Sequence, residues 1–327
     1  MQTQAFREYL TARQFQSADI NSQVAFIQRI EGNLQHKMPS WSLEDLNLAS
    51  TQDLVNDLID QGENRIENLQ YLARYAWAIN NQDMYNALFE MLDGCEAMEN
   101  LYKKLGDYAG EDLRDIIFEE MPLPPLGLSR REKSRYTYRI THRMKLIFEE
   151  TTIKDLLKDC LRDLPDSLYG DVNKDYYDLC DGDIDRYLIL KGERFLHNLF
   201  NCKLEGKTFF GQVITDEVIK FVKENPQIGQ GVREGGIIFE TKIPYNTQAY
   251  LLSSDCDEKR YHYCHCPWAK ESLKTGALLV PACFCQCSAG FHKKRYELIY
   301  QQPLKAEVIQ SVLRGDMVCQ FAIHLPE

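Results

Sequence analysis

The sequence predicts an α+β protein in which an all-α N-terminal domain precedes a C-terminal α+β domain with a small, mainly antiparallel sheet. Three observations predict this class. Apolar residues recur at spacings of three and four up to about residue 120. The segment MPLPPLG (121–127), with three prolines, then interrupts the helical pattern. After residue 230 the apolar runs become short and β-branched or aromatic, with turn residues between them.

Residues 1–120 are expected to form an acidic helical domain of five or six helices. Ser42, with Asp45 three residues later, and Ser50 or Thr51 ahead of DLVNDLI are typical helix starts. The acidity is marked between residues 41 and 100, which contain twelve Asp or Glu and only two arginines. The segments with helical spacing are 6–10, 24–30, 53–60, 66–79 and 84–107.

The predicted linker covers residues 121–146 and combines the proline-rich stretch with a basic segment. Residues 130–145 carry seven Lys or Arg against one Glu. We expect this segment to dock on acidic residues of the same chain. The second domain is then expected over 147–327. It begins with helical spacing in 152–165, 184–203 and 216–224.

The strands of the second domain are expected in four short runs after residue 230. Their connections are too short and irregular for repeated parallel crossovers, so an antiparallel sheet is expected. GQGVREGG (229–236) is expected to be a hairpin-like turn, because a strand follows it where a phosphate-binding loop needs a helix. The expected strands are 236–245, 259–266, 277–287 and 317–325, and two helices are expected between them at 289–300 and 305–313.

Composition and charge narrow the class of protein. The net charge of −11 disfavours a whole-protein role on nucleic acid, since phosphate binding needs a basic surface. The first twenty residues lack a signal peptide pattern, and no later run is long and apolar enough to span a membrane. We therefore expect a cytoplasmic protein whose eleven cysteines are free thiols or metal ligands. The sequence gives no indication of oligomeric state.

Five cysteines fall within 24 positions, as a C-x-C pair and a C-x-C-x-C triplet. Two cysteines of a C-x-C pair on a strand point to one face, roughly 6.5 to 7 Å apart. Two such strands side by side would bring four thiols together around zinc or an iron–sulfur cluster. The ligands expected for such a metal site are Cys264, Cys266, Cys285 and Cys287.

Cys287 also has a second interpretation, as a reactive thiol. It precedes an expected helix with three basic residues, and a helix N-terminus stabilises a thiolate. His292 would then be its partner base, which makes Cys287 and His292 the candidate catalytic pair. Tyr263, Trp268 and Phe291 lie between the cysteines and are candidates to line an apolar ligand pocket. The alternative for all these residues is plain core packing.

The last 120 residues or so resemble a known group of domains. The shared features are the terminal G-D-x-x-C-x-F strand, a cysteine-rich lead-in to a helix and the order of strands and helices. This part resembles 4-vinyl reductase-type hydrocarbon-binding domains and L-2-amino-thiazoline-4-carboxylic acid hydrolase-like proteins. The whole chain is similar to a bacterial cysteine-motif family with C-H-C-P-W and C-x-C-S-A-G-F-H-K-K. The resemblance implies a compact module that binds small, often apolar or sulfur-containing molecules, sometimes with a cysteine-held metal. The residues of the terminal strand motif are Gly315, Asp316, Cys319 and Phe321.

Two functions follow as hypotheses. The first is a small-molecule- or metal-binding protein that uses the C-terminal cysteine cluster, with a thiol- or metal-dependent hydrolase left open. The second is an interaction or DNA-binding protein, because the helical N-terminal region looks like the core-binding domain of tyrosine recombinases. No recombinase catalytic set follows that region. For the second hypothesis, Arg135 and Arg139 of the basic segment are the candidate DNA contacts.

Overall fold

The computed structural model describes residues 2–158, 161–162, 170–275 and 279–326, so Cys160 and the end of the expected helix 152–165 lie outside the described residues. The chain forms two compact units. Unit 1 comprises residues 1–95 and 124–129, and unit 2 comprises residues 96–123 and 130–327. The first boundary thus lies at residue 95, about 25 residues before the predicted linker. Part of the proline-rich segment belongs to unit 1.

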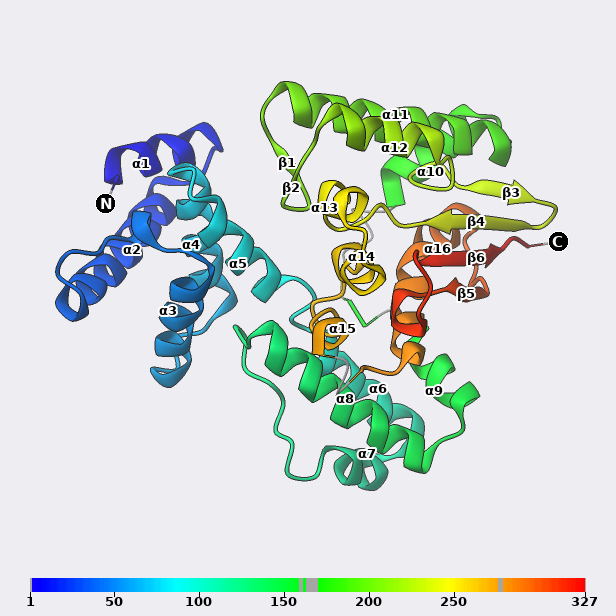
Figure 1. Ribbon diagram of the computed structural model, residues 1–327, viewed down its shortest axis with the longest axis horizontal. Helices are drawn as coiled ribbons and strands as arrows, with labels where there is room; N and C mark the ends of the chain where they lie inside the picture. The colour runs from blue at the N-terminus through cyan, green and yellow to red at the C-terminus, as the bar shows by residue number, and fades with distance from the viewer. Residues whose placement is uncertain (1, 159–160, 163–169, 276–278, 327) are drawn as a thin grey trace. The chain divides into compact units, whose positions relative to one another are not determined.

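All regular elements in the described residues of unit 1 are helices, as predicted (blue to cyan in Figure 1). Its core is a single apolar cluster centred on fully buried residues such as Phe6, Ile27 and Tyr75. Ser42 forms the predicted capping box with Asp45. The next helix is capped by Asn47, because this side chain accepts two backbone N–H groups one turn ahead of the expected serine. The elements are α1 (Thr3–Ala12), α2 (Ser17–Lys37), η1 (Leu43–Asp45), α3 (Leu48–Asp60), α4 (Ile66–Ala78) and α5 (Gln82–Leu92).

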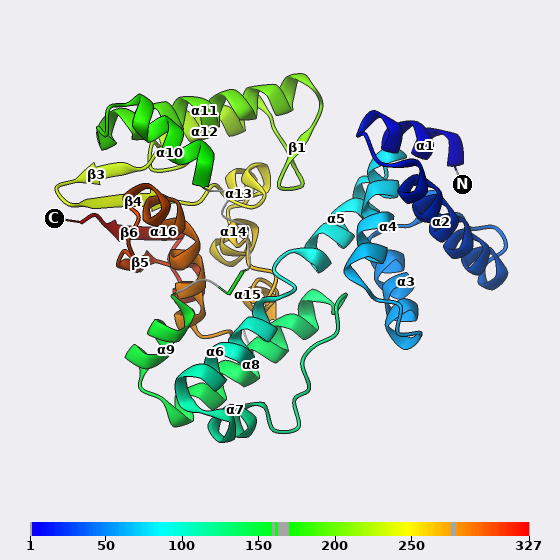
Figure 2. The same cartoon turned by 180° about the vertical axis from the view of Figure 1, so that it is seen from behind.

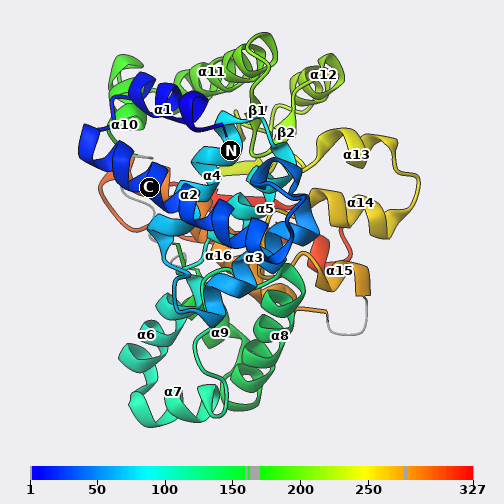
Figure 3. The same ribbon diagram turned by 90° about the vertical axis from the view of Figure 1, so that its left-hand side faces the viewer.

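Unit 2 begins with four helices that lie together at one end of the unit, as Figures 1 and 3 both show. Gly110, at φ 85, separates the first two of these helices, because this backbone conformation ends the first helix. They share an apolar cluster with residues from the cysteine-rich segment, including Trp268, Cys283 and Phe284. These helices are α6 (Ala97–Ala109), α7 (Glu111–Phe118), α8 (Arg130–Ile147) and α9 (Glu150–Leu157).

Three further helices and a short hairpin occupy the opposite end of unit 2 (Figures 1 and 3). Asp183 and Thr215 cap two of the helices with their side-chain oxygens. A small apolar cluster around Leu199 and Val218 joins the second and third of these helices and the first strand of the hairpin. The elements are α10 (Gly170–Leu179), α11 (Ile184–Leu204), β1 (Thr208–Phe209), β2 (Gln212–Val213) and α12 (Asp216–Glu224).

The main sheet of unit 2 is antiparallel, as predicted, with strand order β3-β4-β6-β5. Its strands are β3 (Val232–Glu234), β4 (Ile237–Thr241), β5 (Ala306–Gln310) and β6 (Gln320–His324). GQGVREGG leads into the β3–β4 hairpin and does not form a phosphate loop. Helix α16 (Gln286–Tyr300) packs along β5 and β6 (Figure 2). The residues on this face of β4 are Ile238 and Glu240, both buried.

Three sequence predictions in this unit are wrong. Residues 259–266, expected as a strand, belong to α14 (Cys256–Tyr263) and the turn after it. Residues 277–287, also expected as a strand, contain η3 (Ala282–Cys285) and the first turn of α16 in their described part. Residues 305–313, expected as a helix, form β5 and η4 (Val312–Arg314), because the β-branched pair Val308 and Ile309 lies on a strand that pairs with β6. Two short helices, α13 (Thr247–Leu252) and α15 (Ser272–Thr275), flank α14.

None of the helices in the described ranges combines the length and the apolar character that a membrane span requires.

Candidate functional site

The cysteines of the cysteine-rich segment lie at the end of one helix, α14, and at the start of another, α16. The carboxylate of Asp255 accepts the N–H groups of Asp257 and Glu258, both at 2.9 Å, and so caps α14. This cap fixes a helix where the Tyr–His–Tyr sequence favours a strand. Cys264 then terminates α14 and is buried, and Cys266 lies in the turn that follows. The assumption that C-x-C pairs lie on strands is therefore incorrect.

Four thiols gather beside the sheet, and one of them differs from the predicted set. They belong to Cys264, Cys266, Cys285 and Cys319, and every pair among them interacts electrostatically. Burial raises the pKa of Cys264 and of Cys266 to about 11 and that of Cys285 well above its usual range. These thiols are therefore protonated at neutral pH. Cys319 was not among the predicted metal ligands.

Two of the predicted metal ligands make hydrogen bonds within the protein. The sulfur of Cys285 lies 3.1 Å from the hydroxyl of Ser311, and the sulfur of Cys287 accepts the backbone N–H of Leu161 at 3.3 Å. In the part of the chain that the structure describes, no three His, Cys, Asp or Glu side chains are arranged to hold a metal ion. Zinc or iron–sulfur binding by Cys264, Cys266, Cys285 and Cys287 stays a prediction.

The expected pairing of Cys287 with His292 is replaced by another pairing. Both residues lie in α16, where a separation of five positions turns their side chains roughly 140° apart. Ser288, four positions before His292, is the residue on the same side of the helix. The Nδ1 atom of His292 instead lies 2.6 Å from Glu240 Oε2. Glu240 on β4 thus orients the imidazole of His292, and no such orienting residue was predicted from the sequence.

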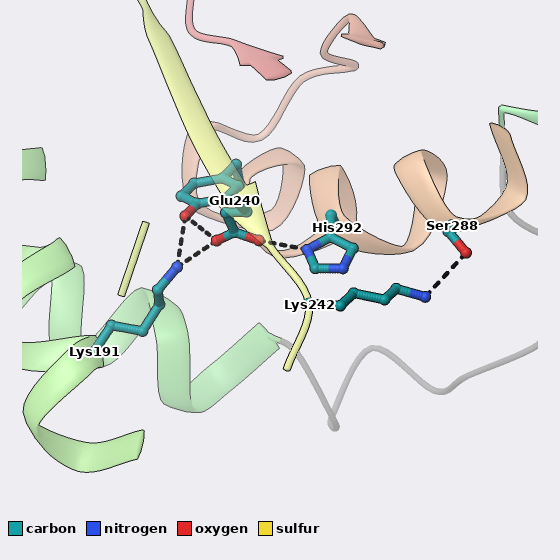
Figure 4. Close-up of polar contacts among 6 residues, drawn as sticks. Lys191, Glu240, Lys242, Ser288 and His292 are labelled. Atoms are coloured by element: carbon teal, nitrogen blue, oxygen red, sulfur yellow. Dashed lines mark hydrogen bonds and ion pairs between the residues drawn. The ribbon is translucent and has the colours of Figure 1, made fainter. Parts of the chain in front are cut away.

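Glu240 is the centre of a buried polar network that joins β4, α11 and α16 (Figure 4). The hydroxyl of Tyr296 donates to Glu240 Oε1 at 2.6 Å, and the ammonium of Lys191 donates to the Tyr296 oxygen at 2.8 Å. Lys191 also forms an ion pair with Glu240. The side chains of Glu240 and Lys191 are only 6% and 9% exposed, so both charges are removed from water. A buried ion pair is costly to form unless its remaining polar atoms are also satisfied, as they are here.

The electrostatics of this network fix the protonation states. Burial would raise the pKa of Glu240, but Lys191, Arg295 and the hydrogen bond from His292 hold it well below its usual range. Burial lowers the pKa of His292 to about 4 against the opposing effect of Glu240. Burial likewise lowers the pKa of Lys191 to about 8. At neutral pH the network therefore contains an ionised carboxylate, a charged lysine and a neutral imidazole whose Nδ1–H faces the carboxylate.

A second polar pair lies next to the first. The ammonium of Lys242 donates to the hydroxyl of Ser288 at 3.0 Å. Lys242 lies two residues after Glu240 on the extended chain, and Ser288 lies one helical turn before His292 (Figure 4). Two strand residues advance about 6.6 Å and four helical residues about 6 Å, so the two periodicities match. Glu240–His292 and Lys242–Ser288 thus form two rungs between β4 and α16.

The Lys242–Ser288 rung is more accessible than the Glu240–His292 rung. Lys242 and Ser288 are half-buried, whereas Glu240 and His292 are buried. Phe321 stacks on the His292 ring at 4.5 Å, and the Lys242 ammonium lies 5.8 Å from the centre of the Phe321 ring. The second ring nitrogen of His292, Nε2, lies on the side of Lys242 (Figure 4). The half-buried edge of the site therefore presents the ammonium group of Lys242 and the hydroxyl of Ser288.

Lys242 also connects this edge to the thiol group. Its backbone N–H donates to Cys319 O at 3.1 Å, and its carbonyl accepts the hydroxyl of Tyr263. Against the larger effect of burial, the Lys242 ammonium lowers the pKa values of Cys264, Cys266 and Cys319. The four thiols and the two rungs therefore belong to one region of unit 2.

The three aromatic residues predicted to line a ligand pocket lie in different surroundings. Tyr263 is fully buried in the cluster that contains Cys264 and Cys319. Trp268 is buried in the other large cluster of unit 2, where the ammonium of Lys133 lies 5.3 Å from its ring centre. Phe291 is half-buried next to His292, at 5.8 Å between ring centres. Of the three, Phe291 is the one beside the His292 rung.

Sequence reasoning missed the partners of His292 and Ser288 itself. Glu240 stands in the apolar run GIIFETK, two residues after Ile238 and thus on its buried face. An acidic residue on the buried face of a strand is a signal for a polar partner inside the protein. Lys191 in YLILKGERF carries the same signal within an apolar helical stretch. Ser288 was recognisable by its i, i+4 relation to His292.

Comparison with known proteins adds no relative, because no family model, no curated protein and no solved structure matches the chain.

Proposed function

We propose that unit 2 is a hydrolase for a small molecule, with His292 as general base and with Lys242 and Ser288 as the groups that bind the reacting oxygen. One observation carries this proposal: Nδ1 of His292 lies 2.6 Å from the buried carboxylate of Glu240. With the proton on Nδ1, the lone pair of the imidazole is on Nε2, toward Lys242 (Figure 4). A buried carboxylate that fixes the tautomer of a histidine is a recurrent arrangement for general-base catalysis.

The proposed reaction uses water as the nucleophile. Nε2 of His292 accepts a proton from water while the water oxygen bonds to the electrophilic carbon of the substrate. The imidazolium that forms is stabilised by Glu240, 2.6 Å from Nδ1. The negative charge that develops on the substrate oxygen is stabilised by the Lys242 ammonium and by the Ser288 hydroxyl. When the bond to the leaving group breaks, that group takes the proton back from His292, so the enzyme returns to its starting state.

The protonated thiols of Cys264, Cys266 and Cys285 favour this role for histidine over nucleophilic attack by one of these three cysteines. A thiol attacks as its thiolate, and burial raises the pKa values of Cys264, Cys266 and Cys285 far above neutral pH. Neutral thiols instead supply a polarisable, weakly polar surface beside Lys242. That surface suits the small apolar or sulfur-containing molecules that the resemblance to hydrocarbon-binding and thiazoline hydrolase-like domains implies.

The test measures hydrolysis of p-nitrophenyl acetate by the full chain and by two histidine variants. His292→Gln should lower kcat/KM by about 100-fold or more, the usual contribution of a general base. His262→Gln is the matched control, since His262 is a half-buried histidine of α14 without a part in the network. For the wild type, kcat/KM should rise with pH around pH 4, where His292 loses its proton, and then stay level up to pH 7. Equal rates for the two variants would refute the proposal.

Polyanion binding by α8 is a second candidate function. Arg131, Arg135 and Arg139 are exposed and recur every four residues, so they form one basic stripe along this helix. Other basic residues of the segment are used within unit 2: Lys133 is buried against Trp268, and Arg143 donates to the carbonyl of Ile117 at 2.9 Å. A gel-shift assay with duplex DNA at low salt tests this candidate. Binding that Arg135→Gln and Arg139→Gln weaken together would support it, and absence of binding would exclude it.

A further inference from the structure

Lys270 is a buried lysine held between aromatic rings. It lies in the turn between α14 and α15 and is 5% exposed. Its ammonium nitrogen is 3.8 Å from the ring centre of Tyr245 and 4.8 Å from that of Tyr261. Lysine is almost never this buried without a charged partner.

The charges around Lys270 add to the effect of burial. Glu271, the nearest acidic side chain in sequence, accepts the Tyr261 hydroxyl at 2.7 Å. Arg130 from α8 also reaches that hydroxyl, at 3.4 Å, and the Lys274 ammonium from α15 lies 4.1 Å from the centre of the Tyr261 ring. Burial first, and then Arg130 and Lys274, lower the pKa of Lys270 to about 7, against smaller opposing effects of Cys264 and Glu271.

The consequence for reactivity is large. A lysine with its ordinary pKa of 10.5 has fewer than about one neutral amine in a thousand at pH 7, whereas Lys270 has about one in two. The neutral amine is the nucleophilic form of lysine. Burial first, and then the nearby Lys270, lower the pKa of His262 on α14, so this neighbouring histidine is mostly uncharged at pH 7. Burial and the neighbouring cations thus outweigh Cys264 and Glu271 and favour a free amine at this position.

We propose that Lys270 is a reactive amine that forms a reversible imine with the carbonyl group of a small aldehyde or α-keto acid. The lysine nitrogen bonds to the carbonyl carbon, and the carbonyl oxygen leaves as water after taking up two protons, one of them from the nitrogen. The product at neutral pH is a protonated imine, a cation. The faces of Tyr245 and Tyr261 stabilise a cation at this nitrogen, so the aromatic rings favour the product. This inference is independent of the hydrolase function.

Reductive trapping tests the proposal. The full chain is incubated at pH 7 with glyoxylate or, separately, with acetaldehyde or pyruvate, in the presence of cyanoborohydride, and the modified lysines are mapped by peptide mass spectrometry. Lys274 is the internal control, because it lies over the same Tyr261 ring but is exposed. Lys270 should be modified at least 10-fold faster than Lys274. The relative rates with the three probes show whether the site accepts aldehydes, keto acids or both.

Variants separate imine formation from nonspecific labelling. Lys270→Arg should abolish the fast modification, Lys274→Arg should leave it unchanged, and Tyr245→Leu should slow it. Acetic anhydride labelling of Lys270 should have its midpoint near pH 7, well below that of Lys274. The His292→Gln variant should be trapped like the wild type, which keeps this outcome distinct from that of the hydrolase test. Modification of Lys270 at or below the rate of Lys274 with all three probes would overturn the proposal.

Discussion

Replacing Glu240 with glutamine tests whether the buried network acts as an ionic unit. Glutamine keeps the shape of the side chain and removes its charge, so Lys191 stays buried without its counterion and next to Arg295. Breaking a buried ion pair in this way costs about 3–5 kcal/mol of unfolding free energy. The loss has a ceiling because Lys191 can release its proton. Between pH 7 and its ordinary pKa of 10.5, at about 1.4 kcal/mol per pH unit, that ceiling is about 5 kcal/mol.

The assay is urea unfolding followed by the fluorescence of Trp268. The other two tryptophans, Trp41 and Trp77, lie in unit 1, so a background with both changed to phenylalanine reports on unit 2 alone. Asp185→Asn is the matched control. Asp185 lies on α11 like Lys191, and its ion pair with Arg233 at 2.9 Å is exposed, so its loss should cost no more than about 1 kcal/mol.

A double variant completes the experiment. Lys191→Met in the Glu240→Gln background removes the unpaired cation. This second change should recover at least about 2 kcal/mol of the loss, since residues in one network are strongly coupled. The reasoning is refuted if Glu240→Gln lowers the free energy of unfolding as little as Asp185→Asn does. It is also refuted if Lys191→Met lowers the free energy of unfolding of the Glu240→Gln variant further.

Three more predictions follow from the same structure. The free energy of unfolding of unit 2 should fall by at most roughly 3 kcal/mol as pH is lowered from about 6.5 to about 4, because His292 takes up its proton at a higher pH in the unfolded chain than in the folded protein. In urea titrations at each pH, His292→Gln should flatten this dependence, and an unchanged slope would contradict the lowered pKa of His292. With Ellman's reagent at pH 7, exposed Cys256 should react at once and buried Cys264 only on unfolding; Cys256→Ser should lower the amplitude of the fast phase by one thiol, and an unchanged amplitude would contradict the burial pattern. Gly229→Ala should destabilise unit 2 by more than about 2 kcal/mol, since φ is +77 there and a Cβ atom would lie 2.1 Å from the Phe195 ring; a urea midpoint equal to that of the wild type would show that the loop adapts freely.

Elements with strong local signals were predictable. The helices of unit 1 follow from apolar spacing, and Ser42 marked its own capping box. Strands β4 and β6 and the long part of α16 were expected at the right positions. In these segments the local preference and the tertiary contacts agree, so the sequence pattern is sufficient.

The errors lie where distant contacts decide the conformation. Residues 259–263 are rich in tyrosine and histidine, yet the Asp255 cap and the packing of Tyr263 in the core place them on a helix. Residues 306–310 show helical spacing with their neighbours, but β6 offers an open edge with which they pair. Neither the cap nor the edge is visible in the segment concerned.

Only the residues on α16 and around the cysteines were predicted as parts of the candidate site, and their partner on β4 was not. His292 was recognised from its own helix, but its partner Glu240 lies 52 positions earlier in the chain, on a strand. Cys319 was identified as part of the terminal strand and was not connected with the other thiols. Such pairings depend on the order of strands in the sheet, which hydrophobic patterns do not encode.

The match in spacing between β4 and α16 has a consequence for recognising this protein in other genomes. Because two strand residues span the same distance as one helical turn, the four polar groups reduce to a bipartite signature, E-x-K followed about 45 residues later by S-x-x-x-H. The length of the intervening segment is free to change, as insertions between the strand and the helix leave the internal spacing of each half untouched. A single-residue insertion inside either half, by contrast, would separate one pair from the other. A search for sequences that keep both halves and vary in their cysteines would therefore show whether the two polar pairs occur without the thiol group.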